Sequence, residues 1–322
     1  LFVLLQLSQY RGHGTLFLHN KIILANIFIS KLKNKFNNLS IGFYCRNPYG
    51  IAYAFCRSLI ALSVLLTLLF NDLNVFFRPI EGYNFVNTDW NLFCIFKQNL
   101  DYSKWISIAI LTLVIIGWQP RITGIFHWWI CYSLSTSTLM IDGGEHVASV
   151  ITLFLIPLTL LDNRSSHWRK LSFEEFDQKS LISKTIALTF FDITKIQVAI
   201  IYLHAAVGKC NVPEWINGSV IYYWLSDPLF GLNDSFKPII FPLINNQYLV
   251  AIISWSVLAL EFILFSAYFM NRHNKIILLF FGIIFHFFIF IFHGLANFSL
   301  IMIAVLIYYL YEPNTQISKN IT

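Results

Sequence analysis

Residues Ile51–Phe70 read IAYAFCRSLIALSVLLTLLF, an apolar stretch with a single charged side chain, Arg57. An α-helix needs about 20 apolar residues to cross the roughly 30 Å hydrocarbon core of a membrane, so this stretch predicts a spanning helix. Only helices and closed barrels satisfy their backbone hydrogen bonds in lipid, and the alternating segments of about ten residues that mark barrel strands do not occur. We therefore expect an all-α fold, a polytopic helical bundle in the membrane.

The composition of the whole chain supports the same fold class. The chain is 57% apolar and 12% charged, whereas soluble domains contain about 25% charged residues. Its net charge is +6, but the basic residues are spread over the connections between apolar segments and do not indicate binding of nucleic acid. The lipid bilayer is the partner that this composition predicts.

Further apolar segments follow the first, and together they predict about eight spans in one transmembrane domain, residues 47–311. The other predicted spans are 105–118, 123–141, 147–161, 186–207, 248–269, 276–292 and 298–311. Residues 1–46 form an N-terminal lead, in which 21–38 has the pattern of an amphipathic helix on the membrane surface; a disordered lead is the alternative. Residues 312–322 form a short tail.

The distribution of Lys and Arg predicts the orientation, because short cytoplasmic connections carry an excess of both. On the eight-span prediction, most of them fall in the alternate connections that include the two ends of the chain. We therefore expect a multi-pass protein of the cell membrane with both termini in the cytoplasm. Cys94, Lys209, Cys210 and the turn at 142–146 then face the extracytoplasmic side.

The five cysteines show no CxxC pair and no other zinc-ligand spacing, so no metal site is predicted. Cys94 and Cys210 fall on the predicted oxidising side of the membrane. Two interpretations are open, a disulfide between these two residues or two free thiols.

Lys209 lies in the most informative connection, residues 202–224, which read YLHAAVGKCNVPEWINGSVIYYW. The lysine closes an apolar helix just before Val212-Pro213 interrupts it. Partial burial would favour the neutral amine, which can act as a base. The alternative is an interfacial lysine whose ammonium group reaches water. The aromatic residues that follow favour an interfacial belt over a ligand site.

Arg57 and Glu261 are charged residues within predicted spans. Such charges are costly in lipid unless they reach water or find a partner. Arg57 therefore either pairs or reaches water for structural reasons, or it lines a functional cavity. Glu261 is its candidate partner, which would satisfy both charges at once.

Histidines and an acid mark other sites of interest. Glu145 and His146 follow two glycines that allow close approach by a backbone or a ligand. His286 and His293 are seven residues apart and so lie on one helical face. A hydrogen-bonded interior histidine is the simplest interpretation of each, and a substrate-facing role is the alternative.

Four stretches carry a family resemblance: NPYGIAYAFCRSLIALSVLLTLLFN, GWQPRITGIFHWW, DGGEHVASVITLFLIPLTLLD and VPEWINGSVIYYWLSDPLFG. They are similar to the sporulation-delaying protein B family of bacteria. That family belongs to the HTTM group of membrane domains, which includes the vitamin K-dependent γ-glutamyl carboxylases. The resemblance implies a membrane protein that helps to mature a secreted, antimicrobial or toxin-like precursor peptide outside the cytoplasm. It also implies a small partner protein encoded nearby.

The more distant likeness to the carboxylases implies roles for three residues. Their catalytic base is a lysine in a segment similar to YLHAAVGKCNVPEWINGS, which implies that role for Lys209, although Gly208 stands where the carboxylases have a second lysine. His146 and His286 match two further catalytic positions, and the implied cofactor is a reduced quinone such as vitamin K. The alternative is a non-catalytic membrane chaperone or peptide-binding protein, so the sequence leaves open whether the protein is an enzyme.

Overall fold

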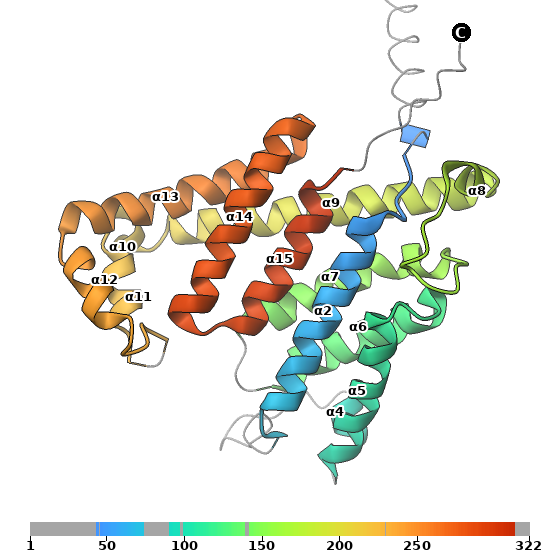
Figure 1. Ribbon diagram of the computed structural model, residues 1–322, viewed down its shortest axis with the longest axis horizontal. Helices are drawn as coiled ribbons and strands as arrows, with labels where there is room; N and C mark the ends of the chain where they lie inside the picture. The colour runs from blue at the N-terminus through green and yellow to red at the C-terminus, as the bar shows by residue number, and fades with distance from the viewer. Residues whose placement is uncertain are drawn as a thin grey trace, which may run out of the picture. The chain divides into compact units, whose positions relative to one another are not determined.

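The computed structural model describes residues 43–44, 46–73, 90–96, 99–138, 142–228 and 230–312 (Figure 1). Within these ranges the regular secondary structure is helical, apart from one isolated bridge between Trp118 and Ser166. The predicted all-α class is therefore confirmed. The described helices belong to one compact unit, Asn47–Asn314. The predicted surface helix at 21–38 lies outside the described residues, as does the tail beyond residue 312.

The helices are α2 (Ile51–Phe70), α4 (Leu92–Ile95), α5 (Leu100–Ile115), α6 (Pro120–Ser137), α7 (Gly144–Leu160), α8 (Phe173–Asp177), α9 (Leu181–Lys209), α10 (Pro213–Ile216), α11 (Val220–Ser226), α12 (Lys237–Ile244), α13 (Gln247–Ser266), the 3-10 helix η1 (Ala267–Phe269), α14 (Arg272–His293) and α15 (Ala296–Leu310). Each predicted span has a helix at its position.

Four of the described helices are long and apolar enough to cross a membrane alone: α2, α9, α13 extended by η1, and α14. The helices α7 and α15 are apolar but contain 17 and 15 residues. At 1.5 Å per residue they are about 25 and 22 Å long, shorter than the roughly 30 Å hydrocarbon core. The structure shows a membrane helical bundle, and it does not confirm the number of eight spans.

The third predicted span, 123–141, is longer than its helix because α6 ends at Ser137. The hydroxyl of Ser137 donates to the Ser133 carbonyl at 2.6 Å, and that of Thr138 donates to the Leu134 carbonyl at 2.9 Å. Such side-chain hydrogen bonds compete with the backbone bonds that would continue a helix. Asn91, which precedes α4, also donates to the Ser133 carbonyl and so fixes this end of α6.

The helices contact one another in a series that Figure 1 lets the reader follow: α14 with α15, α15 with α2, α2 with α5, α5 with α6, and α6 with α7. Helix α9 packs on α7 and pairs with α13. Glycine permits the close approach of α6 and α7, because a Cβ on Gly124 would lie 2.1 Å from Oγ1 of Thr159. Small residues bring helices together in this way in membranes, where packing replaces the hydrophobic effect.

Candidate functional site

Lys209 is the last residue of α9, and its ammonium group reaches α13. Its Nζ lies 2.8 Å from Oε1 of Glu261, with 21% of the lysine side chain and 6% of the glutamate side chain exposed. The same Nζ lies 5.4 Å from the ring centroid of Trp215, which is buried on α10. The structure therefore places Lys209 between an acid and an aromatic ring rather than in open water.

The turn after Lys209 folds back because Val212-Pro213 interrupts the helical sequence. Pro213 has no N–H to continue α9, but it suits the first position of the new helix α10. Two hydrogen bonds then fasten the returning chain to α13: the Trp255 Nε1 donates to the Ile216 carbonyl at 3.2 Å, and the Ser254 hydroxyl donates to the Gly218 carbonyl at 3.0 Å. This return positions Trp215 over the lysine.

Tyr202 and His286 complete a polar cluster within the bundle. Tyr202 lies seven residues before Lys209 on the same face of α9, and its hydroxyl is 3.1 Å from Nε2 of His286 on α14. Lys209 pairs with Glu261 and Tyr202 pairs with His286, and α9 carries both Tyr202 and Lys209. Among the described residues, neither Nδ1 of His286 nor Oε2 of Glu261 has a hydrogen-bond partner. We call Tyr202, Lys209, Glu261 and His286 the lysine cluster.

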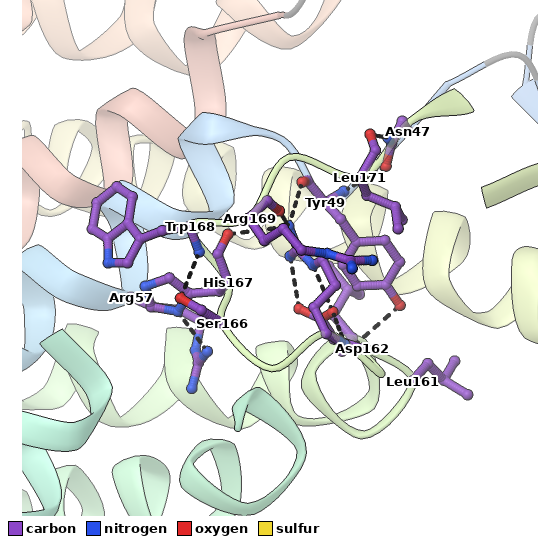
Figure 2. A network of polar contacts seen from close by, with 12 residues as sticks. Asn47, Tyr49, Arg57, Leu161, Asp162, Ser166, His167, Trp168, Arg169 and Leu171 are labelled. Carbon is purple, nitrogen blue, oxygen red and sulfur yellow. Dashed lines mark hydrogen bonds and ion pairs between the residues drawn. The ribbon is translucent and has the colours of Figure 1, made fainter. Parts of the chain in front are cut away.

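Arg57 does not pair with Glu261, so that prediction is wrong. Arg57 is 1% exposed, and its Nη1 donates to Nδ1 of His167 at 2.8 Å (Figure 2). Its Nη2 donates to Oγ1 of Thr123 at 3.0 Å. The connection after α7 brings His167 to Arg57 on α2. Glu261 pairs with Lys209 instead. Analysis of the sequence missed His167 because it lies in a hydrophilic connection with no motif around it.

The partners of His167 determine its tautomer. Arginine can only donate, so Nδ1 accepts and Nε2 carries the proton. That N–H donates to the Ser58 hydroxyl at 3.1 Å, which donates in turn to the Ile115 carbonyl at 3.1 Å. Burial, followed by the nearby guanidinium groups of Arg57 and Arg164, lowers the pKa of His167 to about 2. His167 is therefore neutral at physiological pH.

A buried ion pair holds the same connection (Figure 2). Arg164 donates from Nε and Nη2 to the two carboxylate oxygens of Asp162, both at 2.7 Å, and both side chains are buried. Its Nη1 also donates to the carbonyl of Tyr49 at 3.3 Å and to that of His167 at 3.1 Å. We call Arg57, Asp162, Arg164 and His167 the arginine network.

In the DGGEH turn, Glu145 faces the interior and His146 is exposed. Oε1 of Glu145 accepts from Nδ2 of Asn297 at 2.7 Å, and Asp142 accepts from the Phe298 N–H at 3.1 Å. The turn thus holds the start of α15. Among the described residues, none of the lysine cluster makes a hydrogen bond, ion pair or ring contact with His146, whereas the Phe298 ring lies 5.7 Å from that of His286.

His293, Cys94 and Cys210 lie outside both the lysine cluster and the arginine network. Nδ1 of His293 donates to the Phe230 carbonyl at 2.7 Å, and its ring packs edge-on against Trp224. Cys94 is half-buried and Cys210 is exposed, and both are thiols. Of the two interpretations left open for these residues, the structure has no bridge between them. No group of three or more potential metal ligands occurs within the described part of the chain.

The fold and this cluster define a polytopic helical membrane protein with ionisable side chains held inside its bundle. Residues 50–313 match the HTTM domain. The chain is 40% identical over 283 residues to sporulation-delaying protein SdpB of Bacillus subtilis (strain 168), which covers 85% of each chain. It is 37% identical over 271 residues to the uncharacterized protein YitO of the same organism, which covers 82% of this chain and 86% of YitO. No solved structure matches.

The chain therefore belongs to the HTTM family and is an SdpB-like protein. The resemblance predicted from its four sequence stretches is confirmed.

Proposed function

We propose that this protein acts in the maturation or modification of a secreted, antimicrobial or toxin-like peptide on the extracytoplasmic side of the membrane. Its similarity to a protein named for delaying sporulation supports the proposal. The observation that carries it is the 2.8 Å ion pair between Lys209 and Glu261, whose second carboxylate oxygen, Oε2, is buried and has no partner in the described structure. Ionisable groups inside a membrane bundle are costly, and they mark functional sites by default.

The lysine cluster can supply a base without leaving an isolated charge in the bundle. Nζ of Lys209 and Oε1 of Glu261 are within the 2.6–3.2 Å range in which a proton passes directly. Transfer of one proton from the lysine to the glutamate yields a neutral amine and a neutral carboxyl group. The amine can then take a proton from a bound substrate, and no net charge has been buried.

A carboxylase-like enzyme that uses Lys209 as its base is one form of this proposal. In that form, Nδ1 of His286 and Oε2 of Glu261 are the atoms that would hydrogen-bond to the hydroxyl groups of a reduced quinone. The quinone would supply the strong base when bound, and Lys209 would hold or move its proton. His146, for which the resemblance implies a catalytic role, is exposed at the start of α7, and its role stays a prediction.

A non-catalytic peptide-binding or chaperone protein is the other form. In this form Lys209 keeps its proton and stays paired with Glu261, and the pair serves as a fixed polar group beside the bound peptide. The two forms differ in whether a proton must leave Lys209.

Deletion of the gene in its own host tests the proposal that the two forms share. We expect mass spectrometry of the culture medium to show that one secreted peptide is lost or changed in mass. Restoring the wild-type gene together with any small protein encoded beside it should restore that peptide. Identical secreted peptides with and without the gene would rule out the proposed function.

A further inference from the structure

A cavity of about 350 Å³ lies beside the turn that covers Lys209. It is bounded by the turn between α10 and α11, by α11 itself, and by the junction of α12 and α13. Its polar side chains are three carboxamides, from Asn217, Asn245 and Gln247, a serine hydroxyl, and two phenols, from Tyr222 and Tyr223. None of the residues that line it is charged.

The wall of this cavity continues in sequence from the segment that packs on Lys209. Trp215, which packs on the Lys209 ammonium group, precedes Asn217 by two residues in the same turn. The turn is held tightly, because Gly218 has a φ of +80° and a Cβ there would lie 2.8 Å from the Cα of Ala251 on α13. A ligand in the cavity would therefore touch the segment that positions Trp215 over the lysine.

The lining chemistry selects the class of ligand. Carboxamides and phenols both donate and accept hydrogen bonds, and the amide groups of a polypeptide backbone offer the matching acceptors and donors. A phosphate or carboxylate would find no cation among the residues that line the cavity. The rings of Tyr222 and Tyr223, which are 43% and 59% exposed, offer apolar faces to a side chain. The volume lies near the lower end of the roughly 300–1,000 Å³ of ligand pockets, which suits a short segment.

We propose that this cavity binds a short, uncharged segment of the exported peptide and thereby presents a second part of the same peptide to the lysine cluster. The proposal rests on the function proposed above. Val250, which lines the cavity, and Glu261 both lie on α13, about 16 Å apart along its axis at 1.5 Å per residue. An extended chain covers about 3.3–3.6 Å per residue, so the presented residue lies about five residues from the bound segment.

Site-specific photocrosslinking in the living host tests the site. The photoreactive residue p-benzoylphenylalanine replaces Tyr223 in one strain and Tyr102 in a control strain. Tyr102 is a matched control because it is also a tyrosine and is 61% exposed, on α5. We expect Tyr223→p-benzoylphenylalanine to capture the secreted peptide that the gene deletion alters, identified by its sequence in mass spectrometry, and to capture at least about tenfold more of it than the control.

Capture of lipid, of a glycan or of a second copy of this chain at position 223, or equal capture from position 102, would overturn the proposal. If the deletion alters a secreted peptide that position 223 does not capture, the cavity proposal fails and the proposed function stands. If the deletion alters no peptide, both fail. The spacing is tested separately, by inserting two residues into the exported peptide between the captured segment and the modified residue. We expect the yield of mature peptide to fall about tenfold. An unchanged yield would contradict the proposed distance between the bound segment and the presented residue.

Discussion

The arginine network and the lysine cluster are both buried sets of ionisable residues, yet their hydrogen bonding differs. The four side chains of the arginine network all have partners: Asp162 binds Arg164, and Arg57 binds His167. In the lysine cluster, Oε2 of Glu261 and Nδ1 of His286 are buried and lack partners within the described structure. Buried polar groups are normally paired, so exceptions need an explanation. We infer from this difference that the first set holds the fold and that the second has hydrogen-bonding capacity left for a ligand.

Removing one member of the arginine network should have the largest effect on stability. Arg164→Ala leaves Asp162 as an uncompensated buried charge, which costs about 3–5 kcal/mol. The free energy of unfolding in detergent measures this loss. The matched control is Arg169→Ala, because Arg169 and its partner Glu175 are 55% and 44% exposed and such a pair contributes about 0–1 kcal/mol. Equal losses in the two variants would show that the network does not hold the fold.

Acid should weaken the arginine network through His167. Its folded-state pKa of about 2 lies below the ordinary value of about 6.5, so the unfolded chain binds the proton first. The contribution of His167 to stability is therefore complete above about pH 6.5 and is lost as the pH falls toward 2. Between pH 6.5 and 5 the wild type should lose about 2 kcal/mol more than His167→Gln. Parallel pH profiles of the unfolding free energy would contradict the assigned neutral tautomer.

Breaking the pair in the lysine cluster should cost less than breaking the arginine network. Lys209 is 21% exposed, so solvent screens part of the interaction, and we expect Lys209→Met to cost about 1–2 kcal/mol. Glu261→Met alone should cost a similar amount, and the double variant should cost less than the sum of the two. Unfolding of the three variants completes a double-mutant cycle. Strict additivity would show that the two side chains do not interact.

The two cysteines should have the smallest effect. Because the structure contains no bridge between them, Cys94→Ser and Cys210→Ser should each change the unfolding free energy by less than about 0.5 kcal/mol. Cys210 is exposed and should react with maleimide in the intact protein. A shift in mobility between reducing and non-reducing gels that either substitution abolishes would restore the disulfide interpretation.

The positions of the long apolar helices could be predicted from the apolar runs, because length and hydropathy alone decide whether a segment suits the membrane. The short helices α4, α8 and α12 have no such run and were not predicted. The predicted first span coincides with α2, and the break at Val212-Pro213 predicts where α9 ends. The end of α6 could not be predicted in this way, because it depends on hydroxyl groups that bond to their own backbone.

The pairing of charges could not be predicted either. Hydropathy places Arg57, Lys209 and Glu261 near or within spans, but it does not say which helix faces which. Glu261 pairs with Lys209 because α9 and α13 pack together. Arg57 instead pairs with His167, which lies in the connection after α7. Pairs between distant parts of a chain depend on the packing of the whole bundle.

In the enzymatic form of the proposed function a proton must leave Lys209, and Lys209→Arg tests this claim most directly. Arginine keeps the positive charge and can still pair with Glu261, but it does not lose its proton in proteins. The experiment compares the mass of the secreted peptide from hosts that carry the wild type or Lys209→Arg at equal protein levels in the membrane. We predict that the peptide from the variant remains immature. A fully mature peptide would contradict the claim and favour the non-catalytic, peptide-binding form.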